Sequence, residues 1–384
     1  MSAARLKLAV DARVLGQRGI GRYLANLLRA LSQRRDDLEV RLYLGRASVR
    51  EAVPGDRRFS VEDLSRVPPP WAEQVLIPRL ARAWGADVLH YPDNSGALSS
   101  AVPTVLTLHD TMWRRPLKQA IARPTPRQRL QDAYRKWVCP RAARAAAAVV
   151  TISRHSADCL RQDLGLDGAK VFRCVEGVDP VFRVRLTTAS ARARCRALGL
   201  EGPYVLCSGA SDRRKNIDRL ILAFAVARRR GALKGAQLAV TSLRPGEAAT
   251  TTYRESARLA GVESAVRFLP YISDEDLKAL YQGAAVFAFP SLWEGFGLPV
   301  LEAFAMGCPV MAARATALPE VAGGGAVYVD PLDVDSLAAG LLEAASPRGR
   351  AARARAAKRQ LSRYTWARAA QQHWRVWRGV GGKA

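Results

Sequence analysis

Residues 289–310 read FPSLWEGFGLPVLEAFAMGCPV, and this stretch decides the fold. An apolar run reaches a proline, a glycine-containing loop follows, and a second apolar run then begins. Pro299 suits the first turn of a helix, where its missing N–H is not needed, and Gly307 suits the helix end. The stretch holds two carboxylates, Glu294 in the loop and Glu302 in the second run. It therefore predicts a buried strand, a glycine turn and a helix, with one acid before the helix and one inside it.

The predicted turn lies at the N-terminus of a helix, where free N–H groups and the helix dipole favour a phosphate. Gly295 and Gly297 would let the backbone approach a ligand closely. Glu302, about one turn inside the helix, can accept from two vicinal hydroxyls such as those of a ribose, and Glu294 from a sugar hydroxyl. The alternative is that both acids are ordinary surface residues. The apolar neighbours of Glu302 argue against that alternative.

The rest of the chain alternates short apolar runs with longer helical stretches, which is typical of parallel sheets covered on both faces. Two such series predict an α/β protein of two doubly wound domains, residues 1–185 and 186–364. A helix over residues 365–384 follows them. In such sheets ligands bind beyond the carboxyl ends of the strands. The segments expected to hold a strand, most of them with a polar end, are 6–13, 38–45, 86–93, 103–110, 147–153, 203–216, 236–242, 265–273, 284–297, 308–315 and 326–330.

Two further strand ends carry charged or polar side chains. Arg214 and Lys215 follow the strand at 203–208, and paired cations suit a diphosphate, although a solvated basic turn is the alternative. Asn216 or Asp212 is expected to cap the next helix. His109 follows the strand at 103–108, where it can bond a sugar hydroxyl or stabilise developing charge. A packed histidine is its alternative.

The glycine turn over residues 16–23, GQRGIGRY, can hold a phosphate on its N–H groups through Gly19 and Gly21. It lacks the third glycine of the dinucleotide fingerprint. Ser153 is expected to cap a helix. The segment DVD at 333–335 imitates a metal-binding pattern, but its place before a helix favours capping, so no metal site is predicted.

The formal net charge is +26, with the excess concentrated over residues 114–144 and from 348 onward. Such a field attracts an anionic membrane surface or a lipid-phosphate acceptor, or else nucleic acid. The third interpretation is an arginine-rich composition without a functional partner. No run of 18 apolar residues predicts a membrane span. The first residues resemble a strand rather than a secretory signal. The six cysteines are scattered, which suits free thiols in a reducing cytosol.

Taken in order, the motifs resemble the family-4 retaining glycosyltransferases of the GT-B fold. The most specific part is the pair of acids separated by seven residues in 294–302. The other matching segments are 11–28, 107–110, 151–156, 176–182, 214–221, 317–331 and 364–366.

The resemblance implies two Rossmann-like domains facing a cleft, the first for the acceptor and the second for a nucleotide sugar, with the terminal helix crossing back to the first. It implies that Arg214 and Lys215 hold the diphosphate and Glu302 the ribose. Glu294 and the backbone of residues 295–298, which are Gly295, Phe296, Gly297 and Leu298, would hold the transferred sugar. Gly19 and Gly21 would close over the phosphates, and His109 would lie beside the reacting sugar. It implies retention without a protein nucleophile, a divalent metal or another cofactor.

Two positions depart from the family pattern. Many members carry an arginine where this chain has Ala210, so Arg213 or Arg214 would have to supply that charge. Many also carry an asparagine where this chain has Glu176. The extra carboxylate would contact the acceptor, the base or nothing.

The expected function is transfer of a hexose to a glycan or lipid-linked acceptor in bacterial surface polysaccharide assembly. GDP-mannose is the first expected donor, and UDP-glucose or another UDP-hexose the second. The basic run in the first domain predicts docking on an anionic membrane, which implies a cytoplasmic protein at the inner face of the cytoplasmic membrane. The rivals are a nucleic-acid-binding protein, although no nucleic-acid motif is present, and an epimerase that acts without an acceptor.

Overall fold

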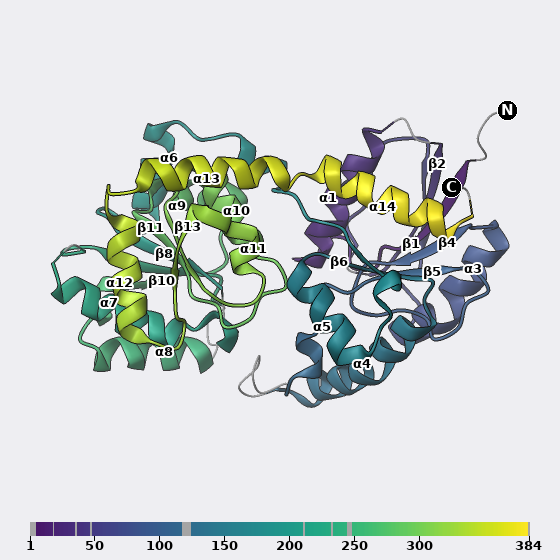
Figure 1. The fold of residues 1–384 in the computed structure, drawn as a ribbon, viewed down its shortest axis with the longest axis horizontal. Helices are drawn as coiled ribbons and strands as arrows, with labels where there is room; N and C mark the ends of the chain where they lie inside the picture. Colours follow the sequence, from purple (N-terminus) through teal and green to yellow (C-terminus); the bar gives the residue numbers. More distant parts are fainter. Residues whose placement is uncertain are drawn as a thin grey trace. The chain divides into compact units, whose positions relative to one another are not determined.

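The computed structural model describes residues 5–17, 19–34, 37–46, 48–116, 124–209, 212–231, 233–243 and 248–382. The chain forms two compact units (Figure 1). The first comprises residues 1–115, 125–177 and 364–384, and the second is built mainly from Val178–Arg363. The division falls after Gly177, earlier than the boundary expected after residue 185. The reason is that Phe182 is buried against Tyr281 of the second unit, with ring centroids 6.0 Å apart.

Within the described residues, the first unit holds a parallel sheet of seven strands in the order β3-β2-β1-β4-β5-β6-β7. Its strands are β1 Leu6–Asp11, β2 Leu38–Leu44, β3 Phe59–Asp63, β4 Val88–Tyr91, β5 Thr104–Thr107, β6 Ala148–Thr151 and β7 Val171–Arg173. Its helices are α1 Ile20–Ser32, α2 Pro69–Trp71, the π-helical turn η2 Ala72–Leu76, α3 Ile77–Trp84, α4 Pro126–Ala145, α5 Arg154–Leu164 and α14 Trp366–Val380.

Both faces of this sheet are buried, as expected for parallel strands. Leu8 and Val10 of β1 pack into one core with α1 and α14. Ala9, between them, faces the opposite core, which includes Ile77 of α3 and Val138 of α4. The alternation follows from the period of two in a strand and requires helices on both sides.

The second unit has the same construction, with six parallel strands in the described residues in the order β10-β9-β8-β11-β12-β13. Its strands are β8 Tyr204–Ser208, β9 Gln237–Thr241, β10 Val266–Phe268, β11 Val286–Phe289, β12 Val310–Ala313 and β13 Ala326–Val329. Its helices are α6 Thr188–Ala197, α7 Ile217–Arg229, α8 Ala248–Leu259, α9 Asp274–Gly283, α10 Leu298–Ala305, α11 Leu318–Ala322, α12 Val334–Ala345 and α13 Arg350–Arg363. The prediction of two doubly wound, Rossmann-like units is confirmed.

The C-terminal helix α14 belongs to the first unit, as predicted, and runs beside α1 (Figure 1). Trp366 and Trp377 join Leu6 and Tyr23 in the same core. The chain leaves the first unit at Gly177, and a Cβ there would lie 2.4 Å from the backbone nitrogen of Trp366. A side chain therefore cannot fit at residue 177 where the departing segment crosses the start of α14.

The strand order reverses once in each sheet, between β1 and β4 and between β8 and β11. Loops diverge from the carboxyl ends of the strands at such a reversal, and ligands of open α/β sheets bind there. These two positions are therefore where functional side chains are expected.

No helix in the described parts of the chain is both long and apolar enough to cross a membrane. The six cysteines all lie in described segments and are free thiols.

Candidate functional site

The strand reversal of the second unit brings together two loops that the sequence singled out. The β8 strand leads into the 3₁₀ turn η7 Arg213–Lys215, and β11 leads into the loop over residues 290–297. The two strands are hydrogen-bonded neighbours, with Val286 opposite Val205. Because both strands are parallel, their following loops lie at the same edge of the sheet.

Lys215 and Glu294 join these two loops. Nζ of Lys215 lies 2.7 Å from Oε1 of Glu294, with side-chain exposures of 17% and 14%. The same ammonium lies 4.7 Å from the ring centroid of Phe289, at the end of β11. The backbone adds a second connection, because Leu292 donates from its N–H to the carbonyl of Arg214 at 2.8 Å. A partly shielded cation and carboxylate thus meet at the reversal point.

Arg214, predicted together with Lys215 to hold a diphosphate, pairs with Asp212. Its Nε lies 2.8 Å from Oδ2 of Asp212, and its Nη2 donates to the same oxygen. Asp212 also accepts from the backbone N–H of Arg214 at 3.0 Å. Asp212 was predicted only as a possible cap, although an aspartate two residues before an arginine is a recognisable turn signal. Ala210, the position of the family departure, lies outside the described residues.

Asn216 fixes the position of this basic turn. Its backbone is left-handed, with φ of 60°. Its side-chain Nδ2 donates to the carbonyls of Pro290 at 3.2 Å and Pro331 at 2.6 Å. These carbonyls follow β11 and β13, so Asn216 ties the start of α7 to two strand ends. The sequence offered Asn216 or Asp212 as the cap. Asp212 caps the 3₁₀ turn η7 through its side chain, whereas the side chain of Asn216 forms no capping bond to α7 among the described residues.

The loop that carries Glu294 rests on the loop after β12. Glu294 donates from its N–H to Oγ1 of Thr316 at 3.0 Å, and Thr316 itself has φ of 52°. Gly297 has φ of 117°, and a Cβ there would lie 2.7 Å from Cδ2 of Leu318. Only glycine satisfies both the backbone angle and this contact. Glycine at residue 297 is therefore explained by the fold, through its backbone angle and its contact with Leu318 on α11, independently of any ligand.

The helix α10 begins at Leu298, directly after Gly297, and the predicted strand, turn and helix are confirmed. Within the described residues its N-terminus has no side-chain cap and its first turn has no acid. Gly295 and Phe296 lie in the preceding loop, and Phe296 is buried. Pro299 has no N–H and the N–H of Val300 donates to the carbonyl of Gly297 at 3.0 Å, so the helix dipole is what favours an anion at this end of α10.

Glu302 lies in the middle of α10 and is buried at 7% exposure. Its Oε2 accepts from the hydroxyl of Tyr281, on α9, at 3.2 Å. Burial raises the pKa of that phenol well above its ordinary value, and the adjacent carboxylate adds to the shift. A bonded carboxylate oxygen keeps further acceptor capacity, so the contact leaves Glu302 able to accept from a ligand hydroxyl.

In the first unit His109 follows β5 and is buried at 8% exposure. Its Nε2 lies 2.9 Å from the carbonyl oxygen of Pro92, and its Nδ1 lies 3.5 Å from Oε1 of Glu176. Burial alone would lower the pKa of His109, but the hydrogen bond and charge of Glu176, together with the Pro92 carbonyl, outweigh it and raise that pKa. Glu176 was noted in the sequence only as a departure, and the structure pairs it with a predicted site residue.

Gly19 and Gly21 lie at the start of α1. Gly19 has φ of 68° and is the N-cap residue of α1. A Cβ on Gly21 would lie 2.4 Å from the carbonyl oxygen of Val14, in the loop after β1. Gly21, in the first turn of α1, therefore packs closely against the loop after β1, whereas Gly19 is required only by its backbone angle.

A second charged cluster at this end of β1 was not predicted. Nη2 of Arg13 lies 2.6 Å from Oδ2 of Asp11 and 3.3 Å from Oε2 of Glu73. Glu73 lies on the π-helical turn η2 and accepts from the hydroxyl of Tyr134 at 2.9 Å. Burial raises the pKa of the Glu73 carboxyl, and the charge of Asp11 adds to the shift. Asp11 and Arg13 are two residues apart, but Glu73 comes from a distant segment, so sequence spacing gave no signal for its part in the cluster.

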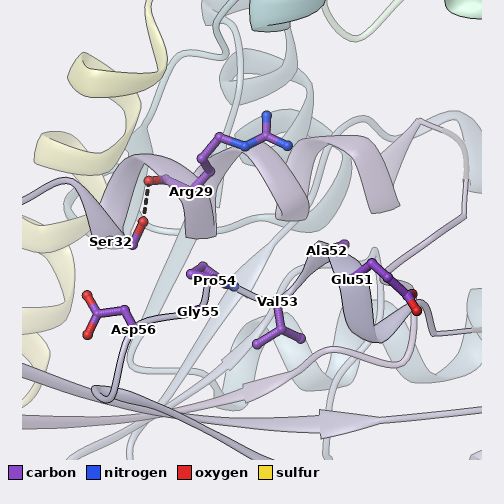
Figure 2. A pocket seen from close by; sticks show the side chains of 8 residues that line it. All are labelled: Arg29, Ser32, Glu51, Ala52, Val53, Pro54, Gly55 and Asp56. Atoms are coloured by element: carbon purple, nitrogen blue, oxygen red, sulfur yellow. Dashed lines mark hydrogen bonds between the residues drawn. The ribbon is translucent and has the colours of Figure 1, made fainter.

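The first unit has a hollow of about 360 Å³. Figure 2 shows the side chains that line it. Arg29 and Ser32 line it from the end of α1, and Asp56 lines it just before β3. This is the amino end of the strands, opposite to the edge that carries His109. The hollow is therefore separate from the predicted site.

Two helix N-caps predicted from the sequence, Ser153 and Asp333, are present in the structure. The side chain of Ser153 accepts from the N–H of Ser156, and that of Asp333 accepts from the N–H of Asp335. Both capping predictions are confirmed. The segment at 333–335 is thus the start of α12.

Comparisons with known proteins agree with this geometry. A family profile described as glycosyltransferase family 4 matches residues 17–182, and one described as glycosyl transferases group 1 matches residues 196–361. The two profiles together match most of the chain. The chain belongs to the family-4 glycosyltransferases.

Two curated relatives of this glycosyltransferase are mannosyltransferases. The MMP α-(1→4)-mannosyltransferase of Mycolicibacterium hassiacum is 34% identical over 62% of this chain and 55% of its own length. The O-antigen chain mannosyltransferase B of Escherichia coli is 48% identical over 21% of each chain. The chain therefore matches about half or less of the length of these relatives.

Among solved structures, the fold of the glycosyltransferase resembles HepE of Anabaena, solved in complex with UDP and glucose. The TM-score is 0.71 at 18% identity, over 97% of this chain and 99% of that one. At this identity the likeness shows the GT-B fold alone. The predicted family and fold are confirmed.

Proposed function

We propose that this glycosyltransferase moves a hexose from a nucleotide sugar to a glycan or lipid-linked acceptor in cell-surface polysaccharide synthesis, with retention of configuration. The observation that carries the proposal is the meeting of Lys215 and Glu294 at the strand reversal of the second unit, 2.7 Å apart. A cation, a carboxylate and the start of α10 provide complementary groups for a diphosphate and a sugar in one place.

Binding of the donor would exchange the partner of each member of this pair. A diphosphate offers more negative charge to Lys215 than one carboxylate does, so Lys215 turns to the phosphates. Glu294 is then released to accept hydroxyls of the transferred sugar. Arg214 supports the diphosphate from the same turn, and Glu302 accepts from the ribose. The backbone of Gly295, Phe296, Gly297 and Leu298 lines the sugar, and Gly19 and Gly21 approach the phosphates.

The proposed reaction uses neither a protein nucleophile nor a metal. The acceptor oxygen attacks the anomeric carbon from the face that the diphosphate leaves, and the departing phosphate oxygen takes the acceptor proton. One C–O bond forms, one breaks, and the nucleoside diphosphate carries the electron pair away. Lys215, Arg214 and the helix dipole at the start of α10 stabilise the growing negative charge.

GDP-mannose is the first proposed donor, because two relatives that match the chain are mannosyltransferases. A UDP-hexose is the second, because HepE, with the same fold, was solved with UDP and glucose. The two are separated by incubating the protein with each nucleotide sugar and measuring the nucleoside diphosphate released. The anomer of the product is then determined by NMR. Release from GDP-mannose with an α product supports the proposal, and release from none of the donors contradicts it.

We also propose that the first unit docks on an anionic membrane through the exposed basic and apolar side chains of α4, here called the α4 surface. Leu130 is 73% exposed and Trp137 is 51% exposed. The guanidinium of Arg141 lies 4.8 Å from the ring centroid of Trp137. Basic residues are attracted to anionic headgroups and tryptophan favours the interface. The exposed basic side chains of the α4 surface are Arg127, Arg129, Arg135, Arg141 and Arg144.

This docking would place the enzyme on the inner face of the bacterial cytoplasmic membrane, next to a lipid-linked acceptor. Lys118 and Arg123, which belong to the same basic run in the sequence, lie outside the described residues.

Binding of nucleic acid is the alternative function for these basic residues. It predicts steep loss of affinity with salt for any duplex or single strand, and no preference for anionic vesicles.

A further inference from the structure

The starting point is the hydrogen-bonding state of His109. Its Nε2 faces the carbonyl oxygen of Pro92 at 2.9 Å. A carbonyl oxygen only accepts, so Nε2 carries a hydrogen. Its Nδ1 faces Oε1 of Glu176 at 3.5 Å. In an ion pair at this distance the carboxylate faces an Nδ1 that carries a hydrogen, and a ring with hydrogens on both nitrogens is an imidazolium.

The surroundings of the pair agree with this state. The side chains of His109 and Glu176 are 10% and 5% exposed, so solvent screens their attraction weakly. The pKa of His109 is raised because Glu176, the Pro92 carbonyl and Asp93 together outweigh burial. The two neighbouring histidines do not compete for this charge: burial lowers the pKa of His90 and of His373, and the charge of His109 adds to both shifts.

Tyr23, the aromatic neighbour of His109, does not form a hydrogen bond with the His109–Glu176 pair within the described residues. The ring of Tyr23, on α1, meets His109 edge-on with centroids 4.8 Å apart. The hydroxyl of Tyr23 instead lies 2.7 Å from Nε2 of His373. Burial raises the pKa of Tyr23 well above its ordinary value, so it stays a neutral phenol beside the pair.

Both members of the pair are held from outside their own loops. The N–H of His109 donates to Oδ1 of Asn94 at 2.8 Å, and its carbonyl accepts from Oγ of Ser156 at 3.0 Å. Next to Glu176, the N–H of Val175 donates to Oε1 of Gln372, on α14, at 2.9 Å. The C-terminal helix therefore holds the backbone next to Glu176, and Asn94 and Ser156 hold the backbone of His109.

We propose that Glu176 is a positioning residue that holds His109 as an oriented imidazolium, so that His109 serves transfer through charge and shape and never as a general base. This rests on the proposed function for the identity of the substrate. A histidine with both nitrogens donating has no lone pair with which to take a proton from an acceptor hydroxyl. It instead presents a fixed cation at the carboxyl edge of the first sheet.

The proposal predicts a pH dependence of activity opposite to that of a general base. A base works in its neutral form, so its activity rises with pH through its pKa. An imidazolium works in its charged form, so activity falls as pH rises through that pKa. Replacing Glu176 removes the negative charge next to His109, so the fall in activity should occur at lower pH.

The test uses the full-length protein labelled with ¹⁵N-histidine. The chain has four histidines, and His109→Gln assigns the signal of interest. In the wild type we expect both nitrogens of His109 to be protonated at pH 7. In Glu176→Gln we expect the titration of His109 to move to lower pH, whereas Glu176→Asp retains the charge and stays close to wild type. Glu263→Gln, an exposed glutamate of the second unit, is the control for the same change of net charge.

Kinetics on the same variants completes the test. Glu176→Gln should lower kcat on the order of tenfold at pH 8 and less at pH 6, with a smaller change in KM for the donor.

A neutral His109 at pH 7 in the wild type, or a titration of His109 that Glu176→Gln leaves unchanged, overturns the proposal without reference to activity. An unchanged pH profile despite a shifted titration overturns the role in transfer. If no nucleotide sugar is turned over, the proposed function fails while the NMR result on the pair still stands. If Glu176→Gln does not fold, the wild-type spectrum and Glu176→Asp still decide.

Discussion

The ammonium of Lys215 and the carboxylate of Glu294 form an ion pair of 2.7 Å between the loops that follow two adjacent strands, β8 and β11. Each residue was expected at the site for a separate reason, one for phosphate and one for sugar. Their pairing means that each shields the other until a ligand arrives. The affinity of the site for a donor therefore includes the free energy of separating them.

Glu294→Gln should separate binding of the nucleotide from transfer of the sugar. The amide keeps the shape of the side chain but releases Lys215, so we expect the Kd for GDP or UDP to be unchanged or lower. Turnover should fall about a hundredfold, because the acceptor for the sugar hydroxyl is weakened in the transition state. Calorimetric titration of the nucleotide and turnover of the matching sugar donor give both values. A parallel loss of nucleotide affinity and turnover would contradict the assignment to the sugar.

Glu302→Ala should weaken nucleotides only when they carry ribose hydroxyls. A hydrogen bond to a charged group contributes about 1.5–3 kcal/mol, so the Kd for the ribonucleotide should rise roughly tenfold to a hundredfold. The 2′,3′-dideoxy nucleotide should bind wild type and variant almost equally. Tyr281→Phe, which removes the phenol that donates to Glu302, is the control for a disturbance of α10. Equal losses for both nucleotides in Glu302→Ala would show a purely structural role.

Removing charge from the α4 surface should abolish binding to anionic vesicles. Each basic residue near a charged membrane contributes about 1 kcal/mol, so Arg129→Glu with Arg135→Glu should lower the fraction bound at least about tenfold. Arg355→Glu with Arg359→Glu on α13 makes the same change of net charge in the second unit. Co-sedimentation with phosphatidylglycerol vesicles and with neutral phosphatidylcholine vesicles measures the difference. Equal losses in the two double variants would point to net charge alone.

His373 should make the first unit less stable in acid. Burial lowers its pKa to about 4, well below that of an unfolded histidine. Its stabilising contribution is therefore complete above pH 6.5 and is lost as the pH falls toward 4. This amounts to about 2 kcal/mol between pH 7 and pH 5. His109 acts in the opposite direction, because its raised pKa gives stability that is lost as the pH rises through it.

Urea unfolding followed by tryptophan fluorescence measures this effect in the first unit, since Trp293 is the one tryptophan of the second. His373→Gln should reduce the drop in unfolding free energy between pH 7 and pH 5. The variant loses the hydrogen bond from Tyr23, so only the pH dependence is compared. The same drop in both proteins would show that other groups titrate.

The sequence predicted those elements whose side chains repeat a clear pattern. The strand, glycine turn and helix over 286–305 were predicted because an apolar run, a proline and glycines mark each boundary. The strands β3 and β7 were missed, because Val61 of β3 and Phe172 of β7 are exposed and no buried pattern marks either segment. Alternation of apolar residues cannot identify a strand at a sheet edge that has little to bury.

The site was predicted as a set of residues but not as a set of contacts. Lys215 and Glu294 meet because β8 and β11 are neighbours, and that order is a property of the whole sheet. The pairing of His109 with Glu176 likewise requires β5, β6 and β7 to lie in sequence across the first sheet. The bond between Arg214 and Asp212 is the exception, because two residues in one turn are adjacent in any fold.

The most direct test of nucleotide-sugar binding at the second unit is the thermal unfolding midpoint of the full chain with saturating GDP-mannose or UDP-glucose, compared with Lys215→Ala. A ligand at a hundred times its Kd adds about 2.7 kcal/mol, which for a unit of this size is several degrees. We predict such a rise for the wild type and for Lys234→Ala, an exposed lysine of the same unit, and a much smaller rise for Lys215→Ala. The same rise in Lys215→Ala as in the wild type, or no rise with either nucleotide sugar, would contradict the central claim.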